Sequence, residues 1–199
     1  MGRPSNTEQR KQEIINALLR VMAERGYEKA SIQAIAKEAG LAPGLIHYHF
    51  KTKQEILLGL VNWIASSATE RLDKMETEVS DPWDKLTVFI NARLATGETE
   101  LPQVVSAWVV IAGESIRQPE IKEIYQGLIE QQLNLLKKLI ADVWQNKSVN
   151  SKEVVHLSAI VISAMEGAFQ LSATANEIMP KNYAAKTTLD LIKTRIENS

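Results

Sequence analysis

Apolar residues recur at intervals of three and four along almost the whole 199-residue chain, and this period constrains the fold more than any other feature. Residues on one face of an α-helix have this spacing, whereas strands alternate with a period of two. No run of alternating β-branched residues bounded by turn signals occurs. Prolines, glycines and polar stretches divide the pattern and predict helices over residues 7–25, 31–39, 43–50, 54–78, 82–97, 101–117, 119–145, 152–176 and 181–197. We therefore expect an all-α protein of about nine helices, with three short helices followed by a helical bundle.

Composition excludes several kinds of chemistry. The chain has no cysteine, so disulfides, thiolate zinc sites and thiol catalysis are ruled out. The N-terminal sequence MGRPSNTEQRKQE lacks the apolar core of a signal peptide. The most apolar run, residues 104–113, is about half as long as a membrane helix. We expect a soluble, cytoplasmic protein without a membrane partner.

Charge is divided unevenly along the chain. Up to Lys53 there are nine basic and five acidic residues, a net charge of +4. The remainder has 14 basic and 19 acidic residues, a net charge of −5, which gives the overall −1. A basic segment joined to an acidic one indicates a module for a polyanion attached to a second part. We predict a division into residues 1–53 and 54–199.

Residues 31–50, SIQAIAKEAGLAPGLIHYHF, contain the parts of a helix-turn-helix. Ser31 is a good N-cap for the first short helix, and Gly40 suits its C-terminal end. The second helix carries Ile46 and Phe50 at i, i+4, a spacing that predicts a buried stripe.

A helix-turn-helix places its second helix in the major groove, with the N-terminal part of that helix nearest the base edges. The residues expected to read bases lie off the buried stripe and are Pro43, Gly44, Leu45, His47 and Tyr48. Lys51, Thr52 and Lys53 follow directly and are expected to hold phosphates, with help from amides of the next helix. Ser31 is a further expected DNA contact.

His47 and His49 form a His-x-His pair, a spacing that invites a metal site. On a helix, residues two apart point about 200° away from each other, so these imidazoles cannot bind one ion. No cysteine or third nearby histidine completes a ligand set. We predict no metal and no cofactor, and we expect His49 to be a packed, hydrogen-bonded residue where two helices meet.

The stretch from Gly40 to Lys53 follows a known pattern: Gly-hydrophobic-Ser/Thr-x-Gly-x-hydrophobic-Tyr-x-His/Tyr-Phe, then Lys-x-Lys. The matching residues are Gly40, Leu41, Gly44, Ile46, His49, Phe50, Lys51 and Lys53. With these motifs, residues 7–60 resemble the TetR family of bacterial transcriptional regulators. Two positions depart from the pattern: Ala42 stands where a Ser or Thr usually caps the helix and contacts phosphate, and His47 stands where Tyr is typical.

The resemblance implies roles for both parts of the chain. Residues 1–53 would be the DNA-binding domain, in which Arg3 belongs to a basic arm that reaches a minor groove and Ala42 lies at the phosphates. Residues 54–199 would form a ligand-binding and dimerisation domain, whose last two helices build a four-helix bundle with a twofold mate. The small residues expected at that interface are Ala159, Ser163 and Gly167, although small residues at helical spacing also occur in plain cores.

The stretches SAWVVIAGESIRQPEI and SAMEGAFQL more weakly resemble the C-terminal domain of the BetI-like subgroup, which includes a choline-responsive repressor. In them Glu114 and Glu166 interrupt apolar helical stretches, with Trp108 and Phe169 close in sequence. An aromatic wall and a carboxylate would hold a cationic ligand through cation–π contact and charge. The alternative is that the aromatic residues belong to the core and the acids reach solvent or pair with Arg117 or a lysine. Further pocket candidates are Trp63, Tyr125 and His156.

These features predict a ligand-responsive, sequence-specific DNA-binding transcriptional regulator. We expect a homodimeric repressor on a palindromic operator of double-stranded DNA, controlled by a small cationic or amphipathic effector. An enzyme is not expected, because no nucleophile–base arrangement, glycine-rich phosphate loop or paired-carboxylate motif occurs. A DNA-binding chromosome-organising protein that ignores small molecules is the alternative, and activation in place of repression also stays open.

Overall fold

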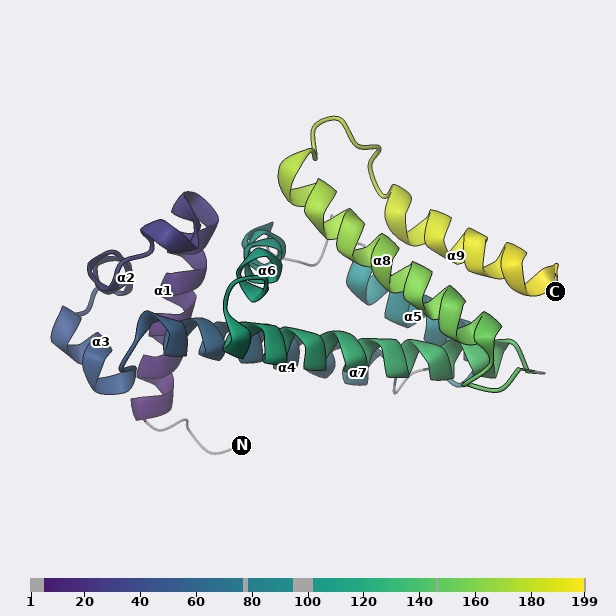
Figure 1. The fold of residues 1–199 in the computed structure, drawn as a ribbon, viewed down its shortest axis with the longest axis horizontal. Coiled ribbons are helices and arrows are strands. Elements are labelled where there is room, and N and C mark those ends of the chain that lie inside the picture. The colour runs from purple at the N-terminus through teal and green to yellow at the C-terminus, as the bar shows by residue number, and fades with distance from the viewer. Residues whose placement is uncertain (1–5, 77–78, 95–101, 146, 199) are drawn as a thin grey trace.

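The computed structural model of the protein describes residues 6–76, 79–94, 102–145 and 147–198, apart from side chains 68, 71–76 and 102. Over these residues the chain forms nine α-helices and no strand, which confirms the predicted all-α class (Figure 1). The helices are α1 (Asn6–Lys29), α2 (Ile32–Ala39), α3 (Pro43–His49), α4 (Lys53–Glu76), α5 (Pro82–Leu94), α6 (Pro102–Ser115), α7 (Pro119–Val143), α8 (Lys152–Thr174) and α9 (Tyr183–Glu197).

The helix boundaries agree with the predicted ones to within a few residues, with one instructive difference. The first helix was predicted to end at residue 25, but helical residues resume after a kink at Gly26 and continue to Lys29. Gly26 has φ 75° and ψ 165°, a backbone conformation that only glycine adopts readily. Gly26 was therefore correctly predicted to interrupt the helix, but the prediction that the helix ends there was wrong. The predicted ends at 78 and 97 and the predicted start at 101 lie outside the described residues.

The first three helices gather at one end of the molecule, and we call this group the head (Figure 1). Capping explains why α2 is short: the Ser31 hydroxyl oxygen accepts a hydrogen bond from the Ala34 N–H at 3.2 Å, and Gly40 ends the helix with φ 66°. Fully buried apolar side chains from all three helices then hold the head together; they include Ile14, Leu18, Met22, Ile35 and Ile46.

The remaining helices form a longer body with two apolar clusters. One cluster is shared by α5, α7, α8 and α9. The other begins in the head, continues along the first turns of α4 and reaches α6, α7 and Phe169 of α8. Because α1 packs directly against α4 and α6, the head and the body share one apolar core. The predicted boundary at residue 53 falls at the first residue of α4, and the division into two domains stays a prediction.

Helix α8 is the one described helix that is long and apolar enough to cross a membrane by length and composition. Core helices of soluble proteins pass the same test, and α8 packs against α5, α6, α7 and α9. This observation is therefore weak evidence for a membrane span.

Candidate DNA-binding surface and effector site

Helix α3 turns one face into the head and the other toward solvent. Pro43 occupies its first turn, Ile46 is fully buried, and the N–H of Phe50 closes the helix on the Ile46 carbonyl at 2.9 Å. On the outer face, Tyr48 is 78% exposed and His47 is exposed. The remaining residues predicted to read bases also lie on the outside: Pro43 and Gly44 are exposed and Leu45 is half-buried. The arrangement leaves the outer face free to enter a groove.

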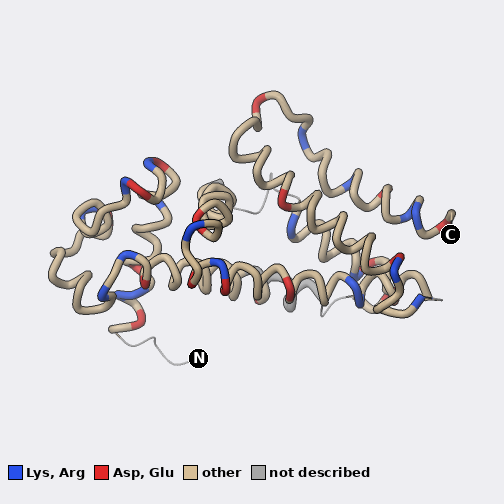
Figure 2. The backbone as a smooth tube through the Cα atoms, in the orientation of Figure 1, with Lys and Arg blue, Asp and Glu red and all other residues tan. Residues whose placement is uncertain are grey.

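The turn between α3 and α4 adds donors beside this face. Lys51 and Thr52 are both exposed, and blue segments mark this corner in Figure 2. The Lys51 N–H donates to the Glu55 carboxylate at 2.8 Å, and the Thr52 hydroxyl oxygen accepts the Glu55 N–H at 3.1 Å. Neither the hydroxyl hydrogen of Thr52 nor the ammonium of Lys51 takes part in these two bonds, and the phosphate contacts expected of both residues stay predictions.

Lys53 lies differently from the neighbouring lysine. Its side chain is half-buried, and its Nζ donates to the Tyr27 carbonyl at 2.9 Å. The same Nζ lies 4.1 Å from the centroid of the Tyr27 ring, a cation–π contact. The ammonium predicted to hold a phosphate is thus engaged at the end of α1.

The other predicted DNA contacts divide into three cases. Ser31 is exposed but uses its hydroxyl oxygen as the N-cap of α2. Ala42 is exposed at the N-cap of α3 and, as expected for alanine, forms no side-chain cap. Arg3 lies outside the described residues.

His49 occupies different surroundings from the exposed His47. It is half-buried, and its ring meets the Tyr48 ring edge to face at 5.0 Å and 87°. Within the described residues its imidazole has no hydrogen-bond partner, so the packed position was predicted but the expected hydrogen bond is not seen. No group of three or more His, Cys, Asp or Glu residues that could hold a metal ion occurs there either.

Three predicted ligand-binding residues from α6, α7 and α8 converge inside the body. The Trp108 Nε1–H donates to both Glu166 carboxylate oxygens, at 3.2 and 3.1 Å. The Tyr125 hydroxyl donates to Glu166 Oε2 at 2.8 Å. The rings of Trp108 and Tyr125 are 5.1 Å apart and inclined at 35°. We call these three residues the Glu166 cluster; Phe169, also predicted, is buried in the same apolar core.

The electrostatics of the Glu166 cluster are unbalanced. Burial raises the pKa of Tyr125, and its hydrogen bond to Glu166 and the charge of that carboxylate raise it further, so the phenol stays a neutral donor. Trp108 is 7% exposed and also neutral. Among the described residues, no lysine or arginine forms an ion pair with Glu166. The cluster therefore holds a half-buried carboxylate that only neutral donors stabilise.

Glu114 and Trp63 do not join this cluster. Glu114 lies near the end of α6, where its carboxylate accepts the Gln118 Nε2–H at 2.7 Å and lies 4.0 Å from the Arg117 guanidinium. Its negative charge contributes, after burial, to raising the pKa of Tyr27 in the head. Trp63 is half-buried on α4 against the shared core. For Glu114, the structure favours the alternative reading, in which the acid pairs with Arg117.

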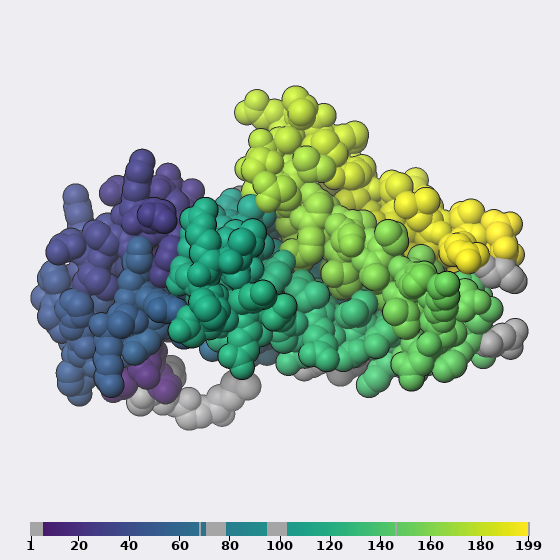
Figure 3. All heavy atoms as spheres, in the orientation of Figure 1, coloured from purple at the N-terminus to yellow at the C-terminus, as the bar shows by residue number. Residues whose placement is uncertain are grey.

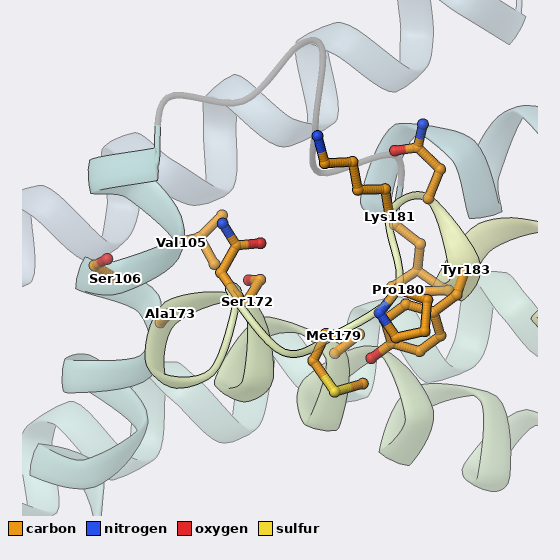
Figure 4. Close-up of a pocket in the computed structure, with 13 residues that line it drawn as sticks. Val105, Ser106, Ser172, Ala173, Met179, Pro180, Lys181 and Tyr183 are labelled. Atoms are coloured by element: carbon orange, nitrogen blue, oxygen red, sulfur yellow. The ribbon is translucent and has the colours of Figure 1, made fainter.

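A hollow of about 540 Å³ opens between α6, α8 and the segment that joins α8 to α9. Val105, Ser106 and Ala173 lie across it from Pro180 and Tyr183 (Figure 4). None of the predicted ligand-binding residues lines it. Its lining residues are Leu94, Val105, Ser106, Ala168, Ser172, Ala173, Asn176, Met179, Pro180, Lys181, Asn182, Tyr183 and Ala184, with one ammonium and no carboxylate. Sequence reasoning missed these residues because most lie in or beside a non-helical connection, where periodicity gives no signal.

The outer face of α8 carries the predicted interface residues. Ala159, Ser163 and Gly167 are all exposed, as is the pocket candidate His156. Beyond Lys152 the exposed residues of α8 include no Lys, Arg, Asp or Glu. Ile160 is 67% exposed on this face, and Leu191 of α9 is 65% exposed. In Figure 3 the two helices lie together along one side of the body, with no other element over them.

An exposed recognition helix on an α-helical body with an internal polar cluster defines a helix-turn-helix regulator. Residues 14–60 match the family model of the bacterial regulatory proteins of the tetR family. The fatty acid metabolism regulator protein of Bacillus subtilis (strain 168) is 30% identical over 152 residues, which span 75% of this chain and 76% of that relative. The chain belongs to the TetR family of bacterial regulatory proteins, as the recognition-helix motif predicted.

Solved structures with the same fold extend over nearly the whole chain. A transcriptional regulator from Saccharomonospora viridis in complex with choline has a TM-score of 0.83 at 22% identity and covers 94% of this chain and 96% of its own. FadR from Bacillus subtilis in complex with stearoyl-CoA has a TM-score of 0.69 at 20% identity, covering 91% and 96%. BetI of Rhizobium meliloti (strain 1021) is 22% identical over 115 residues, 58% of this chain and 56% of that protein. PksA of Bacillus subtilis (strain 168) and BetI of Rhizobium meliloti (strain 1021) are both HTH-type transcriptional regulators.

Proposed function

We propose that the protein is a ligand-responsive repressor that binds a palindromic operator as a homodimer and releases it when a small organic cation binds at the Glu166 cluster. In this proposal residues 1–53 bind DNA in the bacterial cytoplasm, and residues 54–199 bind the effector and the second copy. The observation that carries the DNA-binding part is the outer face of α3, which is exposed while Ile46 anchors its inner face.

Base reading is proposed for Pro43, Gly44, Leu45, His47 and Tyr48. The small residues at the start of α3 permit a close approach of the backbone to the base edges, and the His47 and Tyr48 side chains supply hydrogen-bonding groups. Phosphate contacts are proposed for Lys51 and Thr52 and for Ser31 and Ala42 at the two N-caps. A minor-groove contact is proposed for Arg3 in the N-terminal arm.

Dimerisation is supported by the outer face of α8 and α9. Beyond Lys152 the exposed face of α8 has no Lys, Arg, Asp or Glu, and such a face on a regulator of this kind indicates a protein–protein contact, because water solvates apolar side chains poorly. Ala159, Ser163 and Gly167 would let two copies of α8 approach closely across a twofold axis, with Ile160 and Leu191 filling the space around them. Two heads related by this axis would read half-sites about 34 Å apart, one turn of DNA.

The effector class follows from the unbalanced charge of the Glu166 cluster. A cation near Glu166 would supply the opposite charge that the described residues lack, and the faces of Trp108 and Tyr125 would attract it through their quadrupoles. The related structure that holds choline supports this class. The hollow with Lys181 supports an amphipathic effector with an acidic head as the second candidate, and the related structure that holds stearoyl-CoA fits that class.

Two measurements test the proposal. In a gel-shift at moderate salt, the protein should bind a duplex from upstream of its own gene more tightly than a scrambled duplex. In a thermal-shift assay, choline or tetramethylammonium should raise the melting temperature and weaken operator binding, because effector and DNA binding are reciprocally coupled. Glu166→Gln, which removes the charge and keeps the shape, should abolish both effects of the cation.

Each alternative function predicts a different outcome of these two measurements. A response to stearoyl-CoA and none to the cations would favour the hollow over the Glu166 cluster. Specific DNA binding that no small molecule changes would favour a ligand-insensitive structural protein. Equal binding to both duplexes would end the proposal of a specific regulator, and increased transcription on binding would make it an activator.

A further inference from the structure

Gly44 has no side chain at a position where packing within the head does not require a glycine. It lies in the first turn of α3, directly after Pro43. A Cβ atom added at Gly44 would meet no side chain or neighbouring element within 4 Å, whereas a Cβ at Gly59 of α4 would lie 3.0 Å from the Ile15 side chain. Glycine in a helix costs stability relative to alanine, because it loses more conformational freedom on folding. Packing inside the protein therefore explains Gly59 and does not explain Gly44.

The space above Gly44 opens onto the outer face of α3. Tyr48 follows Gly44 by four residues, so the two positions are neighbours on this face, and Tyr48 is 78% exposed. The Tyr48 ring meets the His49 ring edge to face, with centroids 5.0 Å apart, and does not come within 4 Å of the added Cβ. Leu45, next to Gly44 in the chain, is half-buried. An open space thus lies beside an aliphatic and an aromatic side chain.

The charge around this space suits DNA. No Asp or Glu occurs between Glu38 and Glu55, and the charged residues of that stretch are Lys51 and Lys53. A polyanion can therefore approach the outer face of α3 without repulsion from a carboxylate on this helix. Within the proposed function, that polyanion is double-stranded DNA.

The outer face of α3 lacks the side chains that usually distinguish bases by paired hydrogen bonds. Guanine is typically read by Arg or Lys, adenine by Asn or Gln, and cytosine by Asp or Glu. None of these six residue types occurs between Leu41 and Phe50. The remaining base-specific feature of the major groove is the 5-methyl group of thymine, which apolar side chains contact.

We propose that the space above Gly44 receives the 5-methyl group of a thymine in each half-site, that Leu45 and Tyr48 contact this methyl group, and that the contact helps to determine the operator sequence. The inference rests on the proposed function, because it needs a specific DNA ligand. Gly44 contributes by having no side chain, which lets α3 approach the base edge more closely by the width of one methyl group. His47 adds a hydrogen bond to a neighbouring base.

Replacing thymine by uracil tests the methyl contact, because uracil lacks only the 5-methyl group and pairs with adenine in the same way. The probe is the duplex that the wild-type protein enriches most strongly from a random pool of unmethylated synthetic DNA, so thymine is its one source of 5-methyl groups. Each thymine is replaced in turn, and affinity is measured by fluorescence anisotropy at constant salt. We expect one thymine in each half-site at which uracil weakens binding about fourfold, the value for burial of one methyl group.

Gly44→Ala should reverse this preference. The new methyl group occupies the space that the thymine methyl needs, so the variant should bind the selected duplex about tenfold more weakly. Uracil at the same position removes the competing methyl group, so it should strengthen binding by Gly44→Ala about threefold while it weakens binding by the wild type. The melting temperature of the variant should rise by about 1–4 °C, because alanine restricts the unfolded chain. A loss of folding then cannot account for the weaker DNA binding.

The matched control is Gly127→Ala in α7. A Cβ added at Gly127 also meets nothing within 4 Å, so the same substitution is made in a helix outside the head. It should leave the affinity and the effect of uracil at their wild-type values.

Two results would overturn the inference. One is that uracil weakens wild-type binding at no thymine of the selected duplex. The other is that Gly44→Ala binds this duplex normally or responds to uracil in the same direction as the wild type. Failure of the proposed function gives a different result, because the wild-type protein would then enrich no duplex from the pool.

Discussion

The Glu166→Leu variant tests whether the Glu166 carboxylate is the hydrogen-bond acceptor for the Trp108 indole and the Tyr125 hydroxyl. Trp108 Nε1–H and the Tyr125 hydroxyl both point at Glu166, with donor–acceptor distances of 2.8–3.2 Å. Leucine has a similar volume and accepts neither bond. A buried donor left without a partner costs about 1–3 kcal/mol. Two such donors give about 2–6 kcal/mol, and the removal of a half-buried, unpaired charge offsets part of this loss. We expect Glu166→Leu to destabilise the protein by about 2–4 kcal/mol.

The control is Glu166→Gln, whose amide oxygen still accepts a hydrogen bond and which carries no charge. It should cost about 1 kcal/mol or less, because a bond to a charged acceptor becomes a neutral one while the unpaired charge disappears. Urea unfolding followed by circular dichroism gives both values, with the slope m as a check that the two-state analysis holds. If the leucine variant is as stable as the wild type, then water or another group satisfies these donors and the cluster is not organised around Glu166.

Four further changes have definite expected outcomes. Gly26→Ala should cost about 1–3 kcal/mol in urea unfolding, because the φ of 75° and ψ of 165° at the kink strain any side chain; an unchanged midpoint would mean that the kink relaxes. His47→Ala should weaken operator binding about tenfold in anisotropy while the melting temperature stays constant, and normal binding would remove His47 from the reading face. Ile160→Asp should convert a dimer into a monomer in analytical ultracentrifugation, since a charge would be buried at the contact. Stability should fall above pH 10, by up to about 1.4 kcal/mol per pH unit for each phenol. Burial raises the pKa of Tyr27 and Tyr125 only in the folded state, so the unfolded chain loses these protons first. Tyr125→Phe should reduce that slope in urea unfolding between pH 9 and 11, and an identical slope would show that Tyr125 ionises normally.

The head could be predicted almost completely from sequence because local signals and burial agree there. Ser31 and Gly40 are cap residues at the ends of α2, and they hold those positions in the structure. Ile46 and Phe50 have the spacing of a buried stripe, and both are buried. The residues of α3 that do not belong to this buried stripe form its outer face. The residues proposed to contact bases therefore follow from the same pattern.

The side-chain direction of Lys53 could not be predicted in this way. A lysine after the recognition helix is as suitable for a phosphate as Lys51, and nothing within four residues distinguishes the two. The difference comes from Tyr27, 26 residues earlier in the chain, whose carbonyl and ring lie beside Lys53 only after α1 and α4 have packed. The hollow beside Lys181 could not be predicted either, because most of its lining residues lie in or beside the connection between α8 and α9, where periodicity gives no signal.

Glu114 and Glu166 cannot be distinguished by sequence pattern, but their packing in the structure differs. Each acid interrupts an apolar helical stretch, so periodicity gave both the same role as a ligand carboxylate. Packing separates them: Glu166 faces the indole of Trp108 on a neighbouring helix, whereas Glu114 lies at the end of α6 among Gln118 and Arg117. One acid then has no cationic partner among the described residues and the other has a guanidinium at 4.0 Å. Because a carboxylate without a counter-ion attracts a cation more strongly than a paired one does, we propose Glu166 ahead of Glu114 as the carboxylate that binds the effector.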